Sequence, residues 1–134
     1  MDLKTSANIE IARNYIDLLE KGDIRGVISL FSNSGVVHSP IYGKKTAIDF
    51  YTDLAADTTD SKLTLNGIFE EPNSSRVALY FNYEWTLKNG EIVNFDVVDI
   101  IVFDDEGKIS ELRIIYDTVQ SRGMVNSLDE LKKE

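Results

Sequence analysis

The sequence contains no cysteine, two prolines and a single histidine in 134 residues. Without cysteine the chain forms no disulfide and offers no thiolate to a metal, which fits a reducing cytoplasm. One histidine and scattered acidic residues do not give the spacing of a metal site, and the glycines form no phosphate-binding loop. We therefore expect a protein that works without a metal or another cofactor.

Basic residues are also few, with 14 Lys and Arg against 23 Asp and Glu and a formal net charge of −9. Such a surface repels phosphate backbones, and no basic cluster is present, so we expect no nucleic-acid partner. No hydrophobic run is long enough to span a bilayer, and the first residues lack the apolar core of a signal peptide. These absences predict a cytoplasmic protein with no membrane partner.

What is present is the composition of a globular protein, with 43% hydrophobic residues. The length suits one domain, which we place at residues 1–134 with a core at about 6–118 and a tail at 119–134. Apolar residues at helical spacing predict three helices, at residues 6–21, 24–31 and 46–56. A short strand is expected at 36–38, and a short tail helix near 127–130. Alternating apolar residues and turn signals then predict four strands, at residues 62–71, 76–87, 91–103 and 108–117.

Three helices followed by a run of strands are typical of the α+β class. We expect a cone-shaped, curved, antiparallel or mixed β-sheet wrapped around an internal pocket and covered by the three N-terminal helices. Such a cone is a natural site for a small molecule.

The dipeptide Asn89-Gly90 is a strong hairpin signal and predicts the register of the two longest strands. In a two-residue loop Lys88 lies opposite Glu91. Each residue farther back on the first strand then faces the residue equally far along the second strand. This register places one group of side chains on the pocket face: Tyr80, Asn82, Phe95, Val97, Asp99 and Ile101.

The same register places Phe81, Tyr83 and Trp85 on the opposite face of the sheet. An exposed aromatic patch of this kind usually marks an interaction site, so we expect a homodimer through this outer face. The alternative is that the C-terminal tail covers the patch.

Asp99 is a carboxylate in the apolar segment 95–103. A buried carboxyl group must be paired or protonated, and a neutral one can donate a hydrogen bond. The alternative is a half-exposed strand in which Asp99 faces water. The first interpretation makes Asp99 a candidate for catalysis.

Several short motifs in order resemble one known group of proteins. They are Arg13–Leu18 followed by Gly22–Ile24, Ser39-Pro40, Ala47–Tyr51, Asp96–Asp99 and Phe103–Ile109. From about residue 8 to residue 118 the chain resembles the nuclear-transport-factor-2-like superfamily, which includes the SnoaL-like proteins and the bacterial ketosteroid isomerases.

This resemblance implies that Tyr15 and Asp99 form an oxyanion hole and that Tyr51 supports Tyr15 through a hydrogen bond. Ser39 stands where the isomerases have their catalytic aspartate. Because a serine hydroxyl is too weakly basic to take a proton from carbon unaided, another group must act as the base.

Two residues are candidates for that base. His38 has an ordinary pKa near neutrality, and Asp117 matches the acid found at the end of the last strand in many SnoaL-like proteins. Each also has a purely structural interpretation, His38 as a surface residue and Asp117 as a partner of Arg113. The expected substrate-binding residues are Phe31, Ser39, Tyr51, Tyr80, Asn82, Val97, Leu112 and Tyr116.

The leading hypothesis is a cofactor-independent isomerase or lyase that polarises a substrate carbonyl through Tyr15 and Asp99. Its partner would be a small apolar or carbonyl-containing molecule. The alternative is a non-catalytic ligand-binding or dimerisation module that has lost the isomerase base.

Overall fold

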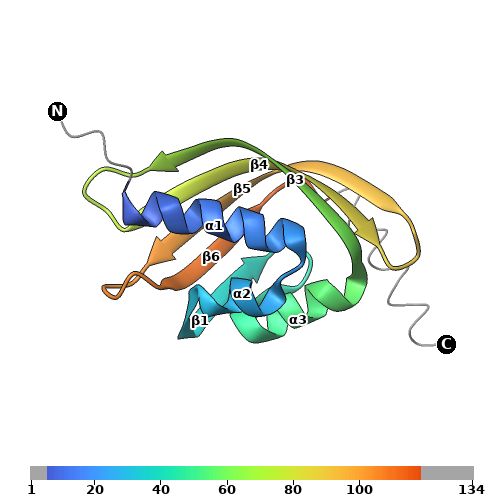
Figure 1. Cartoon of the computed structure of the whole chain (residues 1–134), viewed down its shortest axis with the longest axis horizontal. Helices are drawn as coiled ribbons and strands as arrows, with labels where there is room; N and C mark the ends of the chain where they lie inside the picture. Colours follow the sequence, from blue (N-terminus) through green and yellow to red (C-terminus); the bar gives the residue numbers. More distant parts are fainter. Residues whose placement is uncertain (1–5, 119–134) are drawn as a thin grey trace.

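The computed structural model describes residues 6–118 and has the expected α+β architecture (Figure 1). Within residues 6–118, two helices precede the first two strands, a third helix follows them, and four further strands complete a six-stranded sheet. In chain order the elements are α1 (Ala7–Lys21), α2 (Ile24–Ser29), β1 (Phe31–Ser39), β2 (Gly43–Thr46), α3 (Ala47–Asp57), β3 (Thr58–Glu70), β4 (Arg76–Leu87), β5 (Ile92–Phe103) and β6 (Ile109–Ile115).

The sheet is mixed, with the strand order β2-β1-β6-β5-β4-β3. Only the β1–β6 pair is parallel, and the other four neighbouring pairs are antiparallel. The long strands bend over the helices, so that the sheet is concave on the side that carries α1 (Figure 1). The predicted curved sheet with helices on its inner side is confirmed.

Local signals account for the ends of the helices. The Ser6 side chain accepts a hydrogen bond from the backbone N–H of Ile9, which caps α1. Gly22 ends α1 in the left-handed conformation at φ 72°. Thr46 caps α3 in the same way as Ser6 caps α1, through the N–H of Asp49.

Three details differ from the sequence-based expectation. The second helix ends at Ser29 rather than Phe31, because the chain already joins the sheet at Phe31. The strand expected at 36–38 is longer and extends over Phe31–Ser39 as β1, where the pairing with β6 shifts register. Residues Gly43–Thr46, for which no strand was expected, form the short edge strand β2. The predicted helix at 127–130 lies outside the described residues.

The hairpin register is wrong by one residue, and this is the main correction. Asp99 pairs with Leu79 rather than Tyr80. The N–H of Gly90 donates to the carbonyl of Leu87 at 2.9 Å, and the N–H of Leu87 donates to the carbonyl of Glu91 at 2.8 Å. Gly90 has φ 86°, so the connection is a turn followed by a left-handed glycine, a three-residue loop.

A shift of one residue exchanges the two faces of a strand. Tyr80 and Asn82, expected in the pocket, lie on the outer face, where Tyr80 is 36% exposed. The Asn82 amide donates to the side chains of Asn94 and Asp96 on the neighbouring strand.

The aromatic residues of β4 were expected on the outer face of the sheet and lie on its inner face. Phe81, Tyr83 and Trp85 are buried against the helices, with exposures of 2%, 7% and 3%. The patch that was expected to mediate a homodimer is therefore part of the core. The C-terminal tail, which was its alternative cover, lies outside the described residues.

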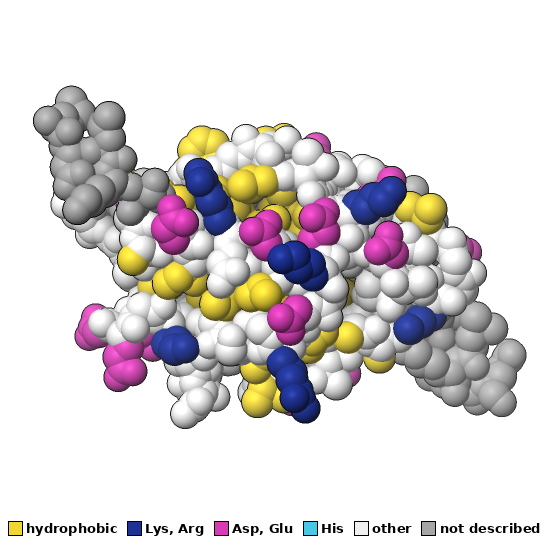
Figure 2. Space-filling model, viewed as in Figure 1, with side chains coloured by type: hydrophobic (Ala, Val, Ile, Leu, Met, Phe, Trp, Pro, Cys, Tyr) yellow, Lys and Arg dark blue, Asp and Glu magenta, His cyan; other side chains and the backbone are white. Residues whose placement is uncertain are grey.

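On the face seen in Figure 2, acidic and basic side chains are interspersed around hydrophobic surface. None of the helices within residues 6–118 is both long and apolar enough to cross a membrane.

Candidate active site

A small inner pocket of about 50 Å³ lies between the concave face of the sheet and the helices. This volume holds a few water molecules at most. Aromatic and aliphatic side chains dominate the lining, with few polar groups among them. The lining residues are Tyr15, Leu19, Ser39, Tyr42, Phe50, Leu54, Phe81, Tyr83, Trp85, Phe95, Val97, Asp99, Ile114 and Tyr116.

Asp99 is the most unusual member of this lining. It is 1% exposed, and its Oδ1 atom has no hydrogen-bond partner within residues 6–118. Burial raises the pKa of this carboxyl group well above its usual range. A carboxyl group in such surroundings favours the protonated form, which offers an O–H to the pocket.

Tyr15 brings a second hydroxyl group to the same pocket from the middle of α1. Its Oη lies 2.7 Å from the Oη of Tyr51 on α3, and both rings are buried. Burial raises the pKa of Tyr15, and the neighbouring Tyr51 and Asp99 raise it further. Both phenols therefore keep their protons, and Tyr15 can donate to a ligand while it accepts from Tyr51.

Tyr51 and Phe31 form a layer behind the pocket rather than part of its wall. Their ring centroids are 5.6 Å apart. Leu112 is fully buried in the core, outside the lining that residues 6–118 provide. Val97 and Tyr116, by contrast, line the pocket as expected from the sequence.

Ser39 lies at the end of β1 and lines the pocket. Its Oγ accepts hydrogen bonds from the backbone N–H groups of Ile41 and Tyr42, both at 3.2 Å. These bonds stabilise the turn between β1 and β2. The Ser39 side chain therefore supports the local backbone in addition to lining the pocket.

A hydrogen-bonded pair of side chains, one of them buried, was not anticipated from the sequence. The Tyr42 hydroxyl donates to Oδ2 of Asp57 at 2.6 Å, and Asp57 is 3% exposed. Tyr42 lines the inner pocket from the turn after β1, and Asp57 ends α3. The two residues are 15 positions apart, and no sequence motif connects them.

His38 and Asp117 lie away from the pocket lining formed by residues 6–118. The Nε2 atom of His38 is 3.1 Å from Oε1 of Glu111, on the side of β1 opposite Val37, whose side chain is fully buried. Asp117 is exposed and follows Tyr116. Because side chains alternate along a strand, His38 points away from the pocket that its neighbour Ser39 lines. Tyr116, the neighbour of Asp117 just after β6, lines the pocket as well.

Comparison with known proteins agrees with this arrangement. The family model described as a SnoaL-like domain matches residues 12–112. The chain belongs to the SnoaL-like domain family.

Several solved structures also superimpose on this chain and have a similar fold. A nuclear-transport-factor-2-like protein of unknown function from Burkholderia pseudomallei superimposes with a TM-score of 0.77 at 17% identity, covering 87% of this chain and 95% of that one. TerC, co-crystallised with polyporic acid, gives 0.76 at 21% identity, with 90% and 99% covered. A Δ5-3-ketosteroid isomerase from Mycobacterium sp. gives 0.73 at 20% identity, with 85% and 95% covered. At these identities the likeness concerns the fold.

Three rings form a stack across the floor of this SnoaL-like domain. Tyr83 and Phe95 have ring centroids 5.7 Å apart at an angle of 20°, and Phe95 and Tyr116 are 4.4 Å apart at 22°. Because these nearly parallel rings pack on one another, they form a continuous aromatic part of the pocket wall.

No group of three or more His, Asp or Glu side chains that could hold a metal ion occurs within residues 6–118 of the SnoaL-like domain. The lining residues instead include five that carry a hydroxyl group and one that carries a buried carboxyl group. The hydroxyl-bearing residues are Tyr15, Ser39, Tyr42, Tyr83 and Tyr116, and the carboxyl group belongs to Asp99.

Proposed function

We propose that this SnoaL-like domain binds a small planar carbonyl compound in the inner pocket and catalyses its enolisation without a cofactor. The observation that carries this proposal is Asp99, a buried carboxyl group that lines the same pocket as Tyr15 and whose Oδ1 has no hydrogen-bond partner within residues 6–118. Two neutral donors in a dry pocket are suited to an oxygen atom that gains negative charge during a reaction.

In the proposed reaction the carbonyl oxygen accepts hydrogen bonds from Tyr15 and Asp99. A proton leaves the carbon next to the carbonyl, its electron pair forms the carbon–carbon double bond, and the oxygen becomes an enolate. Return of the proton to another carbon completes an isomerisation. Donors aimed at the oxygen stabilise the enolate more than the ketone, which lowers the barrier.

The proton acceptor that we propose is the Tyr42–Asp57 pair. Tyr42 lines the pocket, and its hydroxyl already donates to the carboxyl group of the buried Asp57 at 2.6 Å. As Tyr42 takes the proton from carbon, its own proton moves to Asp57, so that no isolated tyrosinate forms. This relay replaces the aspartate that the isomerases have where this chain has Ser39.

The aromatic wall formed by Tyr83, Phe95 and Tyr116 favours an apolar, unsaturated substrate. Two proteins of related fold are named with small organic compounds, polyporic acid for TerC and a ketosteroid for the isomerase. The pocket of about 50 Å³ is much smaller than the roughly 300 Å³ or more of ordinary ligand sites, so we infer a substrate of about one ring or a movement of the pocket wall.

Exchange of α-protons for deuterium in small cyclic ketones, followed by NMR, tests the enzymatic proposal without knowledge of the natural substrate. Asp99→Asn and Tyr15→Phe should each slow catalysed exchange about tenfold to a thousandfold. Tyr42→Phe should abolish it, because the ring then cannot pass a proton. Tyr80→Phe, on the outer face of β4, is the matched control and should exchange like the wild type. Equal exchange in all four variants would refute the proposed site.

A non-catalytic ligand-binding protein is the second candidate, and Ser39 is the observation that favours it. A serine occupied by two backbone N–H groups removes no proton from carbon. Absence of exchange in the wild type, together with phenol binding that depends on Asp99, would support this candidate. In that case Ser39→Asp, which adds a carboxylate to the pocket wall, should create exchange activity.

The homodimer stays a prediction. Because Phe81, Tyr83 and Trp85 are inside, two copies would meet through the outer face of the sheet, where Tyr80 and Ile115 are 36% and 49% exposed. Sedimentation equilibrium should give twice the chain mass, and a monomer mass at high protein concentration would contradict this expectation.

A further inference from the structure

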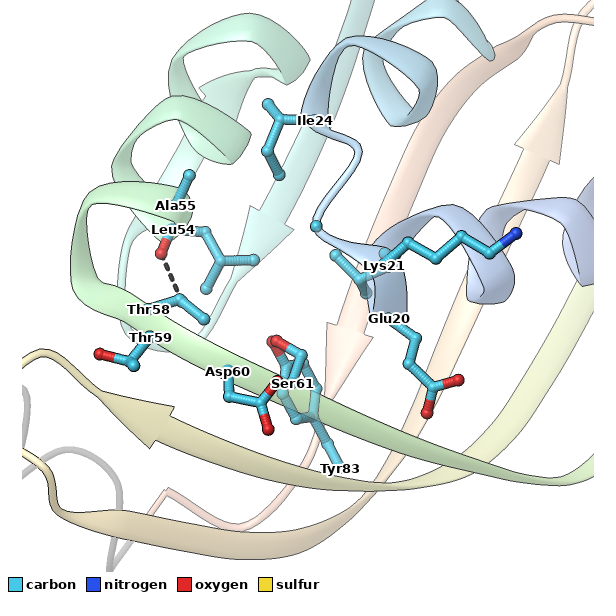
Figure 3. Close-up of a pocket in the computed structure, with 12 residues that line it drawn as sticks. Glu20, Lys21, Ile24, Leu54, Ala55, Thr58, Thr59, Asp60, Ser61 and Tyr83 are labelled. Carbon is cyan, nitrogen blue, oxygen red and sulfur yellow. Dashed lines mark hydrogen bonds between the residues drawn. The ribbon is translucent and has the colours of Figure 1, made fainter.

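A second hollow lies beside the inner pocket. It is a groove of about 240 Å³ between the end of α1, the end of α3 and the start of β3 (Figure 3). It is several times larger than the inner pocket, and neither the family resemblance nor the proposed reaction uses it. A groove of this size accommodates a short polar or aliphatic chain.

The groove and the inner pocket have a common wall. Leu19, Leu54 and Tyr83 line both spaces. Tyr83 is the largest of the three. Its ring stacks on Phe95 on the pocket side, and its hydroxyl lies 2.7 Å from the Oγ of Ser61 on the groove side. In Figure 3 the Ser61 and Tyr83 side chains lie together near the centre of the groove.

A weak polar contact keeps the wall between the groove and the inner pocket closed. The Tyr83–Ser61 contact joins two neutral hydroxyl groups, and such a bond is weak in net terms because water replaces either partner once the wall opens. Rotation of the Tyr83 side chain would join the two spaces. The inner pocket is too small for a ring with a substituent, so a ligand of that shape needs this opening.

The groove also has a charge preference. Glu20 and Asp60 contribute two carboxylates and Lys21 contributes one ammonium group. The Glu20 carboxylate is fixed in place, because it accepts the backbone N–H of Leu63 at 2.9 Å. The net charge of the lining therefore favours a neutral or positively charged group and disfavours an anion.

We propose that the groove and the inner pocket are two chambers of one binding site, with Tyr83 as the gate and specificity-determining residue between them. The ligand is a planar ring with a side chain. The ring, placed against Tyr15 and Asp99, fills the inner chamber, and the neutral or cationic side chain lies in the groove. The inner half of this assignment rests on the proposed function, whereas the gate itself does not.

Trp85, the single tryptophan of the chain, provides a direct readout of the gate. It lines the inner pocket, and its Nε1–H donates to Oγ1 of Thr58, a residue of the groove wall, at 2.7 Å. Quenching of Trp85 fluorescence by acrylamide therefore measures how readily a small neutral molecule passes from the groove to the inner chamber. This measurement needs no ligand.

Two variants break the gate without removing its ring. Tyr83→Phe and Ser61→Ala should each raise the quenching rate constant at least twofold, and the double variant should quench no faster than either single variant, because both remove the same hydrogen bond. Tyr83→Ala should raise it further. Tyr80→Phe, a tyrosine of the same strand on the outer face, should quench like the wild type. If Tyr83→Phe and Ser61→Ala, shown to be folded by circular dichroism, quench like Tyr80→Phe, there is no gate.

Three phenols test the two chambers: phenol itself, tyramine with a cationic side chain, and 3-(4-hydroxyphenyl)propionate with an anionic one. Wild-type protein should bind tyramine at least tenfold more tightly than the propionate. Asp60→Asn should reduce this ratio several-fold, whereas Asp96→Asn, which removes the same charge from the outer face, should leave it unchanged. Equal effects of the two variants would show that only overall charge matters and would refute the groove as a subsite.

The two proposals fail in different ways. If none of the three phenols binds, the proposed function is wrong, and the acrylamide measurement still decides whether Tyr83 is a gate. If phenol binds in an Asp99-dependent manner but the side chain has no effect on affinity, the proposed function stands and the two-chamber site is refuted.

Discussion

The protonation state of Asp99 can be read from the pH dependence of folding stability. Burial raises the pKa of its carboxyl group well above the ordinary value of 3.8, so the native chain holds a proton that the unfolded chain has lost. The free energy of unfolding attributable to this group is therefore greatest below the unfolded pKa. It falls as pH rises, by about 1.4 kcal/mol per pH unit, until the native pKa is reached.

Asp99→Asn keeps the shape of the side chain and cannot ionise. The stability of this variant relative to the wild type should therefore improve with pH, by about 2.7 kcal/mol between about pH 5 and pH 7 if the native pKa lies above that range. Urea unfolding at a series of pH values, followed by circular dichroism, measures the difference directly. The pH at which the difference becomes constant gives the native pKa of Asp99.

Asp96→Asn is the matched control, because Asp96 lies on the exposed face of the same strand and its replacement changes the net charge equally. The reasoning is refuted if the difference between Asp99→Asn and the wild type is already constant from about pH 5 upward. An ionised Asp99 could not donate a hydrogen bond, and the proposed stabilisation of an enolate would then lack one of its two donors.

Other substitutions test single contacts. Tyr15→Phe leaves the buried Tyr51 hydroxyl without its partner and should cost about 1–3 kcal/mol in urea unfolding, as well as weakening phenol binding. Ser39→Ala removes the acceptor of two backbone N–H groups and should cost about 1–2 kcal/mol in the same assay; no loss would mean that the turn holds without it. His38→Gln should leave the rate of ketone exchange within twofold of the wild-type rate, because the imidazole pairs with Glu111 outside the pocket. A large loss of exchange would show that His38, rather than Tyr42, accepts the proton.

The elements of the fold could be predicted because local signals and burial agree along most of the chain. Both α1 and α3 begin and end within one residue of the ranges expected from their apolar spacing. The apolar neighbours of Asp99 were compatible with a buried or a half-exposed carboxyl group, and the structure has it buried. These are properties of short segments, which sequence patterns report well.

The pairing of β4 with β5 was predicted, but its register could not be, since the register depends on one turn. Asn89-Gly90 is compatible with a two-residue loop and with a three-residue loop that ends in a left-handed glycine, and the structure has the second. That single choice moves Tyr83 and Trp85 from the expected dimer face into the site. The Tyr42–Asp57 pair was hidden for a related reason, because only the path of the chain through β2 and α3 brings the two side chains together.

The side chains that line the pocket also determine which oxygen-containing group of a substrate the pocket can bind. Neither Lys nor Arg occurs in the pocket lining that residues 6–118 provide, so a permanently charged carboxylate or phosphate would lose its hydration without gaining a cation. A ketone loses little hydration on binding and becomes charged only when its neighbouring carbon gives up a proton, at the moment when Tyr15 and Asp99 can donate to it. The same lining that excludes a stable anion therefore favours a transient one, and this distinction is why ketone exchange, rather than the binding of organic acids, is the decisive assay for this protein.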